Sequence, residues 1–473
     1  MNPEKNNLLL FTQDSYKCGH YKMYPNGTQK VYSYFESRNG ALYDDTIFFG
    51  LQYLIKKWLL NPVTKEMVDE AEAFAKIHFF DNPNLFNRKG WDYIVNELDG
   101  KLPIRIKAVP EGTRVPVSNV MMTVENTDSN CWWLTNVLET LLTHVWYSSV
   151  VATKSTVTMD LLKEYFEKTS DNVDLYKFYL QDFGQRGTTC MEQAGVGGMA
   201  HLISSLGTDT MMAIPYAVTY YNANINNLGF SVAASEHSIM TAYGKENEFQ
   251  LTKEMIEKYP DGILSVVSDS YDIENALKVY CNELKQDILN RNGKFVVRPD
   301  SPRWKGDKVQ EQVLWIVETL GDGFGFTVNS KGYKVLNPKM GCIYGDGISP
   351  QDIAVTLAEL ESNGWSAENC VYGMGGGLLQ KVNRDTQRSA FKCSAQLRNG
   401  TWVDIQKDPS DKTKSSKKGR LKLIDKNGEF ATVQENEDGV DILETVYENG
   451  ELIKEYTFDE VRKNSQHRLA AKQ

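Results

Sequence analysis

Cysteine is scarce in this sequence, and the few cysteines are scattered. There are seven in 473 residues, an odd number, and no two of them form a C-x-x-C pair. Dispersed single cysteines are typical of reduced, buried thiols, so the sequence predicts neither a disulfide framework nor a zinc cluster. Because such thiols belong to a reducing compartment, we expect a cytoplasmic protein.

Long apolar segments are also missing. No apolar run approaches the ~18 residues that a membrane-spanning helix needs. The opening residues, MNPEKNNLLLF, lack the cationic stretch and the long apolar core of a secretion signal. We therefore expect a protein that is neither exported nor bound to a membrane.

An excess of positive charge is the third absence. The formal net charge is −10 at pH 7, whereas binding to a nucleic-acid backbone needs a basic face. We therefore expect no nucleic-acid partner. Small phosphorylated ligands remain open, since these need only local positive charge.

The sequence does contain six short apolar runs, each ending in a polar or glycine-rich cluster. They lie about 30 to 50 residues apart, the length of a strand, a helix and two loops. Such runs are typical of strands buried on both faces, and in βα barrels the loops after the strands carry the chemistry. We expect an α/β barrel over about residues 175–385. The runs are YLQDFGQRG (179–187), FSVAASEHS (230–238), LSVVSDSYD (264–272), FVVRPDS (295–301), CIYGDGI (342–348) and VYGMGGG (371–377).

Helix signals lie between these runs, and hairpin signals follow them. The apolar spacing from Asp307 predicts a helix that stops at Gly321, and Ser349-Pro350 predicts the start of another. A basic segment, Lys407–Lys422, predicts a mobile, solvated loop. Three Asn-Gly pairs each predict a hairpin: Asn399-Gly400, Asn427-Gly428 and Asn449-Gly450.

Two glycine loops, at 345–347 and 373–377, lie in the last two clusters. Glycine lets backbone N–H groups approach an anion, and a following helix N-terminus adds partial positive charge. Tight turns alone would explain one such loop, but two after the last barrel strands favour phosphate binding. Basic residues in or just after the clusters are candidate partners of that phosphate: Arg186, Arg298, Lys381, Arg384 and Lys392.

Carboxylates follow three of the predicted strands, at Asp269, Asp272, Asp300 and Asp346. Oxygen ligands beside phosphates usually hold Mg²⁺, often through water. We interpret Asp272 as a helix cap, because it precedes IENALKVY. Asp300 and Asp346 are the better candidates for binding a metal or a ribose.

His237 is the one histidine in the six clusters, beside Glu236. It is either a structural residue or a base or phosphate acceptor, and spacing alone does not decide between these. Tyr16 and Phe183 present a similar choice, between ordinary packing and stacking on a flat ring.

Taken together, the motifs resemble those of the nicotinamide phosphoribosyltransferase family, one of the type II phosphoribosyltransferases. The resemblance runs from about Asp14 to FDEVRKN near the C-terminus. It rests on DSYKCGHYK, VYSYFESR, DFGQRG, GTDT, SVAASEHS, SVVSDSYD, RPDS, GDGI, GGGLLQKVNRD, FKCS and SKKGRL, in that order.

The resemblance implies an incomplete, TIM-like α/β barrel and a second, mixed α+β domain built from both chain ends. It also implies a homodimer with shared active sites. The expected domains are 1–150 (mixed domain, with 14–38 reaching the active site), 151–390 (barrel) and 391–473 (hairpin-rich part of the mixed domain).

The implied reaction joins nicotinamide to phosphoribosyl pyrophosphate, with Mg²⁺, and is coupled to ATP hydrolysis through phosphorylation of His237. Catalytic roles would fall to His237, Asp300 and Arg298, and Mg²⁺ would bind at Asp300 and Asp269, partly through water. Phe183 and Tyr16 would stack on the pyridine ring, Tyr16 from the other subunit, while Asp209 would face the carboxamide. The other substrate-binding positions would be Arg38, Arg186, Ser231, Ala234, Ser265, Asp269, Gly345, Asp346, Gly375, Gly376, Arg384, Lys392 and Lys414.

The chain departs from the family pattern at Gln185, at Ala233 and in PRWKGDK (302–308).

Three other functions compete with this one. The nearest is the nicotinate-specific enzyme, which Asp209 disfavours because its carboxylate would repel that of nicotinate. A sugar-phosphate lyase or isomerase would explain the glycine loops but not the paired aromatic residues, and a non-catalytic protein would not need His237, Asp300 and Arg384.

Overall fold

The structure is a computed structural model, and it describes residues 8–408, 410 and 415–466. The chain forms two compact units, each assembled from separate stretches of sequence. Unit 1 comprises Met1–Thr153, Ala217–Ala223 and Asn383–Gln473, and unit 2 comprises Lys154–Tyr216 and Asn224–Val382. The domain limits expected after residues 150 and 390 stay predictions.

The central sheet of unit 2 has seven strands in the order β7-β6-β14-β13-β10-β9-β8, and every neighbouring pair is parallel. A bridge between Gly207, in one edge strand, and Phe230, just before the other edge strand, brings the two edges together, so the sheet curls. Each of the six apolar runs overlaps one of these strands, which confirms the barrel prediction; β7 comes from GTDT. The strands are β6 (Leu180–Asp182), β7 (Gly207–Thr208), β8 (Ala233–Ala234), β9 (Leu264–Val267), β10 (Phe295–Arg298), β13 (Met340–Tyr344) and β14 (Cys370–Met374).

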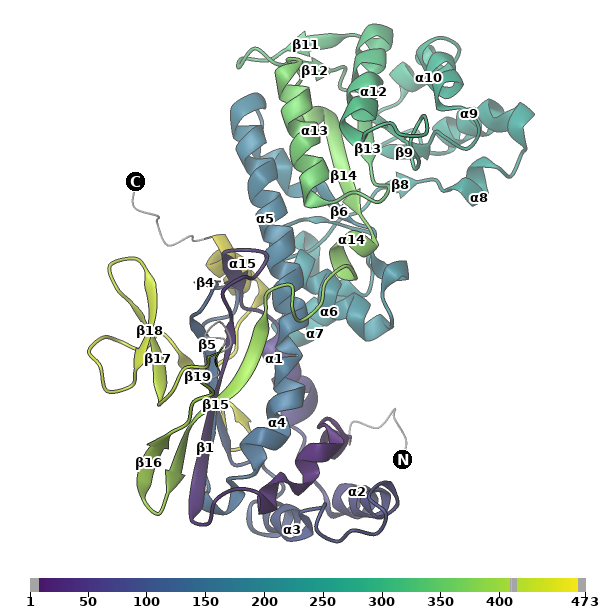
Figure 1. Ribbon diagram of the computed structural model, residues 1–473. Helices are drawn as coiled ribbons and strands as arrows, with labels where there is room; N and C mark the ends of the chain where they lie inside the picture. Colours follow the sequence, from purple (N-terminus) through teal and green to yellow (C-terminus); the bar gives the residue numbers. More distant parts are fainter. Residues whose placement is uncertain (1–7, 409, 411–414, 467–473) are drawn as a thin grey trace. The chain divides into compact units, whose positions relative to one another are not determined.

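Helices connect the strands of unit 2, and α12 and α13 lie side by side along the sheet (Figure 1). A small hairpin, β11 (Phe326–Val328) and β12 (Lys334–Leu336), is added to them. Helix α5 begins in unit 1, and α7 ends there. The helices are α5 (Val145–Thr169), α6 (Met191–His201), α7 (Ala213–Tyr221), α8 (His237–Met240), α9 (Glu248–Lys258), α10 (Ile273–Cys281), α11 (Lys285–Asn290), α12 (Val309–Phe324), α13 (Pro350–Ser362) and α14 (Gly376–Leu379).

Capping decides where several of these helices begin. The Asp272 side chain accepts a hydrogen bond from Asn275 N at 3.1 Å, which confirms its capping role at α10. Ser349 caps α13 as expected. The stop predicted at Gly321 is wrong: α12 continues to Phe324, because Gly321 packs against the Trp365 ring, where a Cβ would lie 2.6 Å from that ring.

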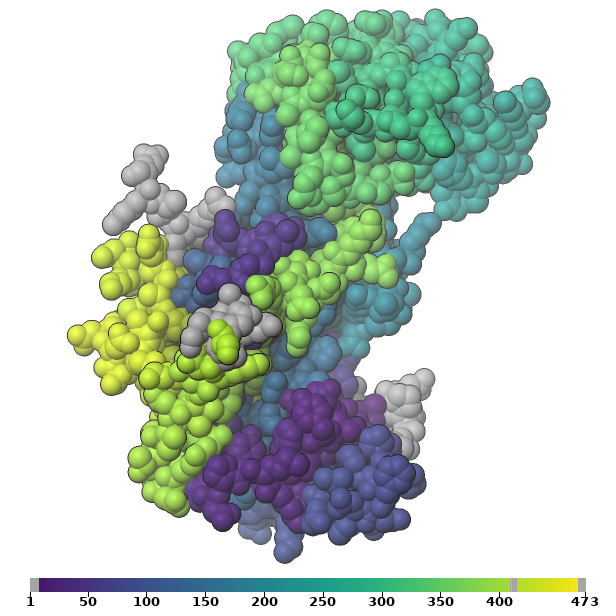
Figure 2. All heavy atoms as spheres, in the orientation of Figure 1, coloured from purple at the N-terminus to yellow at the C-terminus, as the bar shows by residue number. Residues whose placement is uncertain are grey.

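Unit 1 contains an antiparallel sheet in the order β16-β15-β1-β5-β3-β19-β20. The three strands from the beginning of the chain, β1, β5 and β3, lie together, and strands from its end flank them on both sides, as expected for a mixed domain built from both ends. Figure 2 shows these N-terminal (purple) and C-terminal (yellow-green) segments on one face of the molecule. The strands are β1 (Thr28–Ser37), β3 (Ile104–Ala108), β5 (Val120–Asn126), β15 (Ser389–Arg398), β16 (Thr401–Asp404), β19 (Glu444–Glu448) and β20 (Glu451–Leu452).

All three Asn-Gly pairs make the predicted hairpin turns, with positive φ at both residues. They join β15 to β16, β17 to β18 and β19 to β20. The remaining strands form two pairs, β2 (Asp45–Ile47) with β4 (Arg114–Pro116) and β17 (Leu421–Asp425) with β18 (Phe430–Gln434). The helices of unit 1 are α1 (Leu51–Leu54), α2 (Lys65–His78), α3 (Arg88–Glu97), α4 (Leu134–Thr143) and α15 (Phe458–Gln466).

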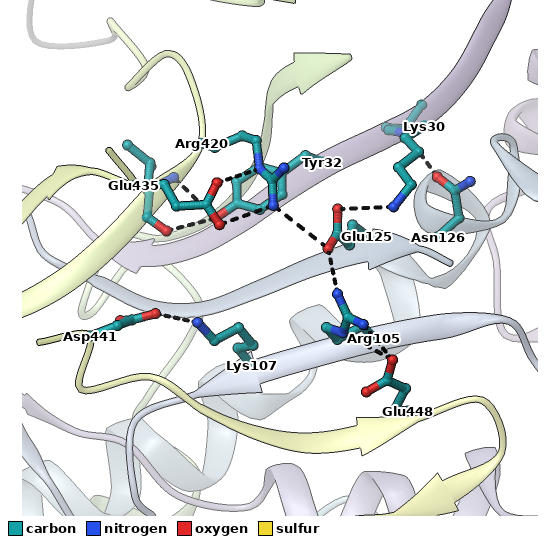
Figure 3. Close-up of polar contacts among 12 residues, drawn as sticks. Lys30, Tyr32, Arg105, Lys107, Glu125, Asn126, Arg420, Glu435, Asp441 and Glu448 are labelled. Atoms are coloured by element: carbon teal, nitrogen blue, oxygen red, sulfur yellow. Dashed lines mark hydrogen bonds and ion pairs between the residues drawn. The ribbon is translucent and has the colours of Figure 1, made fainter. Parts of the chain in front are cut away.

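Ion pairs join the N-terminal and C-terminal strands of this sheet (Figure 3). Glu125 on β5 is nearly buried and lies 3.3 Å from Arg105 Nη1 and 3.9 Å from Arg420 Nη2. Arg105 also contacts Glu448 on β19, and Arg420 pairs with Glu435. A buried carboxylate needs such partners, so Glu125 ties residues more than 290 positions apart into one unit.

Candidate active site

The predicted site residues fall into two groups, one in each unit. Most of the group in unit 2 lies at or just beyond the carboxyl ends of the parallel strands, where βα barrels carry their chemistry, whereas Ser231 precedes β8 and Ser265 is the second residue of β9. It contains Phe183, Arg186, Asp209, Ser231, Ala234, His237, Ser265, Asp269, Arg298, Asp300, Gly345, Asp346, Gly375 and Gly376. The group in unit 1 contains Tyr16, Arg38, Arg384 and Lys392, whereas Lys414 lies outside the described residues.

A carboxylate flanks each ring nitrogen of His237. Its Nε2 lies 3.2 Å from Asp269 Oδ1, and its Nδ1 lies 3.6 Å from Asp300 Oδ2. The His237 side chain remains 44% exposed, so a ligand can reach it. This geometry orients the imidazole and suits a base or a phosphate acceptor. The spacing in the sequence did not decide between such a role and a purely structural one, and the geometry favours the functional role.

Asp269 is held firmly in place behind the histidine. Its second oxygen, Oδ2, accepts hydrogen bonds from Asp300 N at 2.9 Å and from the Ser301 hydroxyl. Both carboxylate oxygens therefore already have partners. Asp269 orients His237, and fewer of its lone pairs remain for a metal ion.

Asp346 lies close to the same cluster. Burial raises the pKa of its carboxyl above the ordinary value, and the negative charges of Asp300 and Asp269 raise it further. Carboxylates crowded in this way favour a bound cation. Among the residues that the structure describes, no three His, Cys, Asp or Glu side chains are arranged to hold a metal by themselves. Mg²⁺ typically uses one or two carboxylates together with substrate phosphates, so Asp300 with Asp346 fits that ion.

Phe183 is fixed between two glycines at the ends of β13 and β14. A Cβ at Gly373 would lie 2.1 Å from its ring, and one at Gly345 would lie 3.3 Å away. Only glycine therefore leaves room for the ring at position 373. The Arg298 guanidinium lies 5.2 Å from the ring centroid and also 3.6 Å from Asp300 Oδ1. Aromatic ring, guanidinium and carboxylate thus form one continuous surface suited to a flat ring joined to a charged group.

Asp209 follows β7 and lies beside the strand that leads to Phe183, because its N–H donates to Asp182 O at 2.9 Å. Its side chain is exposed and accepts a hydrogen bond from the Ser231 hydroxyl. Ala234 and Ser265 are paired neighbours on β8 and β9. The Ser265 hydroxyl is buried and has no partner among the described residues.

Arg186 is the most open side chain of the group, at 88% exposed, with Glu236 Oε2 at 3.8 Å. Such a long, loosely paired ion contact contributes little stability, so its guanidinium is free to bind a ligand.

The second glycine loop keeps its backbone donors free. No hydrogen bond is found from the N–H groups of Gly375, Gly376 or Gly377 to any other described residue. The helix that follows, α14, has only four residues, so the macrodipole expected from the sequence is small. The free N–H groups themselves, rather than a helix terminus, make this loop suitable for an anion.

The group in unit 1 is a cluster of cations around one lysine. Burial lowers the pKa of Lys392 below its ordinary value. The positive charges of Arg38, Lys407 and Arg384 lower it further, against an opposing effect of Glu139. Repelling cations held together in this way are suited to a polyanion.

Tyr16 lies in a 3₁₀ helix, Ser15–Lys22, and its ring is 65% exposed. The ring packs edge-on against His20, with the centroids 5.2 Å apart. One face of the phenol ring therefore remains available for stacking.

Sequence reasoning missed three residues of these groups. Lys407 lies three residues after the end of β16, and its positive charge lowers the pKa of Lys392. Glu36 is buried on β1 and pairs with Arg38 and Lys417. Lys154 contacts the glycine loop. A strand-end position signals Lys407, but a lone charge in a strand or a helix carries no signal for the other two.

The three departures are accommodated within unit 2. Gln185 Oε1 accepts a hydrogen bond from Met212 N at 3.3 Å, and Ala233 lies in β8. In the 302–308 segment, Arg303 stacks over Trp315 at 4.4 Å and pairs with Asp307 at 3.1 Å. None of these contacts involves the His237 cluster.

Comparison with family models gives two matches. Residues 178–451 match the Nicotinate phosphoribosyltransferase (NAPRTase) family, and residues 7–106 match the Nicotinamide phosphoribosyltransferase, N-terminal domain. No helix among the described residues has the length and apolar character to cross a membrane.

Curated relatives match over almost the whole chain. A nicotinamide phosphoribosyltransferase of Xanthomonas campestris is 43% identical over 96% of this chain and 97% of its own. One of Acinetobacter baylyi is 35% identical over 96% of both.

Solved structures share the fold at low sequence identity. A nicotinate-nucleotide pyrophosphorylase of Pyrococcus furiosus has a TM-score of 0.61 at 15% identity, covering 98% of this chain and 96% of that one. Human nicotinic acid phosphoribosyltransferase has a TM-score of 0.55 at 14% identity, covering 97% and 92%.

Proposed function

The chain belongs to the nicotinate phosphoribosyltransferase family, and from that premise we propose that it transfers phosphoribosyl from phosphoribosyl pyrophosphate to nicotinamide. The products are nicotinamide mononucleotide and pyrophosphate, and the pathway is NAD salvage. The pyridine nitrogen forms the bond to C1′ while the bond from C1′ to the pyrophosphate oxygen breaks. The alternative is the same reaction on nicotinate.

Asp209 is the observation that favours nicotinamide. Its exposed carboxylate accepts from Ser231 at one oxygen, which leaves the other free to accept a carboxamide N–H. The same charge would repel the carboxylate of nicotinate. The names of the curated relatives support the same choice.

The reaction follows from what each side chain does. Phe183 supplies a fixed ring face on which the pyridine stacks, and Arg298 and Asp300 lie next to it. Positive charge develops on the ribose as the bond to pyrophosphate breaks, and the carboxylates of Asp300 and Asp346 stabilise that charge. The glycine loop, through Gly375 and Gly376, binds the 5′-phosphate. Mg²⁺, held by Asp300 with Asp346, would neutralise the leaving pyrophosphate.

The coupling to ATP is assigned to His237. Its imidazole is exposed and is oriented by Asp269, which suits attack of one ring nitrogen on the terminal phosphoryl group of ATP with release of ADP. Hydrolysis of the phosphohistidine would then favour synthesis.

A homodimer with shared sites is the proposed assembly. The cations Arg38, Arg384 and Lys392, together with Lys414, would bind the pyrophosphate and phosphate groups, partly across the dimer. Tyr16 would stack on the pyridine from the second subunit. The cytoplasm is the proposed compartment, because the seven cysteines are all free thiols.

The test is a synthesis assay with purified protein, Mg²⁺ and phosphoribosyl pyrophosphate, offering nicotinamide or nicotinate, each with and without ATP. We expect mononucleotide from nicotinamide and a higher yield with ATP. Product from nicotinate alone would establish the alternative, and no product from either base would refute transferase activity.

Asp209→Asn is the matched variant for the choice of base, because the amide keeps the size and removes the charge. We expect the ratio of kcat/KM for nicotinamide over nicotinate to fall about tenfold or more. An unchanged ratio would remove Asp209 from base selection while leaving the transferase activity in place.

A further inference from the structure

Lys154 on α5 is a buried cation next to the second glycine loop. Its side chain is only 8% exposed, and its ammonium donates a hydrogen bond to the Gly377 carbonyl. No carboxylate among the described residues forms an ion pair with it. Burial, together with the positive charge of Lys381, lowers the pKa of Lys154 to about 8.

A buried ammonium without a counter-charge is costly, and its three N–H donors are not satisfied by one carbonyl. The glycine loop beside it adds three more free donors, the N–H groups of Gly375, Gly376 and Gly377. Lys154, Lys381 and the loop thus gather positive charge and free N–H donors in one place, and no carboxylate among the described residues is paired with Lys154. Such an arrangement is explained if an anion completes it.

We infer that Lys154 is a positioning residue for the phosphate group of the substrate. By holding the Gly377 carbonyl, it turns the loop so that the N–H groups face the phosphate. Its charge, together with that of Lys381, is balanced when a phosphate dianion binds. This inference rests on the proposed function, in which that loop binds the 5′-phosphate of phosphoribosyl pyrophosphate.

Binding of the anion has a consequence for the proton on Lys154. An adjacent phosphate favours the charged ammonium and raises its pKa. Above pH 8 the enzyme therefore takes up a proton on binding, and affinity for the phosphate falls as pH rises. Among the described residues, Lys381 is the one charged neighbour whose electric field shifts the pKa of Lys154.

The test compares Lys154→Met, which keeps the length but removes the charge, with Lys154→Arg, which keeps the charge. Lys163→Met is the matched control, since Lys163 lies on the same helix but is exposed and paired with Glu167. For Lys154→Met we expect the KM for phosphoribosyl pyrophosphate to rise about tenfold or more, because a charge-assisted contact is lost. The kcat and the KM for nicotinamide should stay within a factor of about three.

In Lys154→Arg the KM for phosphoribosyl pyrophosphate should return most of the way to the parent value, and in Lys163→Met it should equal the parent value. The rise of this KM between pH 7 and pH 9 should flatten in Lys154→Met. An unchanged KM in a folded, active Lys154→Met would overturn the inference and leave the proposed function standing.

If the parent protein synthesises no mononucleotide, a binding measurement still tests the role of Lys154 separately from the proposed function. Inorganic phosphate should raise the Tm of the parent and of Lys163→Met but not that of Lys154→Met. Equal shifts in all three proteins would reject Lys154 even then.

Discussion

At the scale of single residues, Phe183 shows how backbone and side chain fix one another. Its ring fills the space that glycines at 345 and 373 leave open, so its position is set by residues far away in sequence. A pyridine that stacks on it meets a surface that does not need to be ordered on binding, and that lowers the entropic cost of binding.

Phe183→Ala should therefore raise the KM for nicotinamide about tenfold or more, since stacking and burial of one ring face are lost. Phe183→Tyr keeps the ring and is the control. Steady-state kinetics with nicotinamide as the varied substrate measures both. If the alanine variant keeps the parent KM, the Phe183 ring does not bind nicotinamide.

His237→Ala should keep slow synthesis of mononucleotide and lose the stimulation by ATP, because the phosphate acceptor is gone while the base and ribose sites remain. Initial rates of synthesis measured with and without ATP give the factor by which ATP stimulates each protein. A variant that ATP still stimulates as strongly as the parent would contradict phosphorylation at this residue.

At the scale of elements, Glu111 anchors α1. Its buried carboxylate accepts hydrogen bonds from Gly50 N at 2.7 Å, Gln52 N at 2.6 Å and the Tyr221 hydroxyl at 2.7 Å. Burial raises the pKa of Glu111 to about 7, from 4.5, although these donors oppose the shift. The folded state therefore binds a proton that the unfolded state has released between those two pH values.

This contribution to stability is complete below pH 4.5 and is lost as pH rises to 7. At about 1.4 kcal/mol per pKa unit, the loss is at most about 3.5 kcal/mol. Glu111→Gln cannot ionise, so the difference in free energy of unfolding between parent and variant should change by that much from pH 4.5 to pH 8. Urea unfolding at several pH values measures it, and a difference that is constant with pH would contradict the assignment.

Much of the architecture could be predicted from local sequence. The apolar runs before Asp269, Asp300 and Gly345 are strands, and the Asn-Gly pairs are hairpin turns, because both depend on nearest neighbours. Gly321 could not be predicted, since its place inside α12 depends on Trp365, which lies 44 residues later. Lys154 was missed for the same reason: only the fold brings it to the loop.

The candidate site, too, could be predicted from local sequence only in part. Sequence motifs indicated Asp269 and His237, but the three hydrogen bonds that Asp269 accepts depend on two further strand ends. The short length of α14 was not predicted, although glycine has a low helix propensity and the glycines of the loop could have indicated it.

At the scale of the whole molecule, the proposed homodimer with shared active sites makes a prediction about mixtures. Tyr16→Ala and Arg298→Ala should each be nearly inactive if Tyr16 reaches the barrel of the other subunit. Mixed dimers would then contain one intact site, and a mixture at equal concentrations should regain about a quarter of the parent activity after subunit exchange.

Each variant alone, treated in the same way, is the control. A mixture no more active than its components would place both residues in the same subunit's site. Size-exclusion chromatography of each variant checks that the subunits associate.

The sheet of unit 1 also determines when this protein can finish folding. Strand β1 ends at Ser37, and its partner on one side, β15, begins at Ser389. A ribosome adds roughly 5 to 20 residues per second, so one edge of β1 waits about 20 to 70 seconds for its partner. During synthesis β1, β5 and β3 can pair with one another, but they expose edges that invite pairing with other nascent chains. Efficient production of this protein should therefore depend on molecular chaperones that bind the emerging chain, more than production of a protein whose sheets close in order of synthesis.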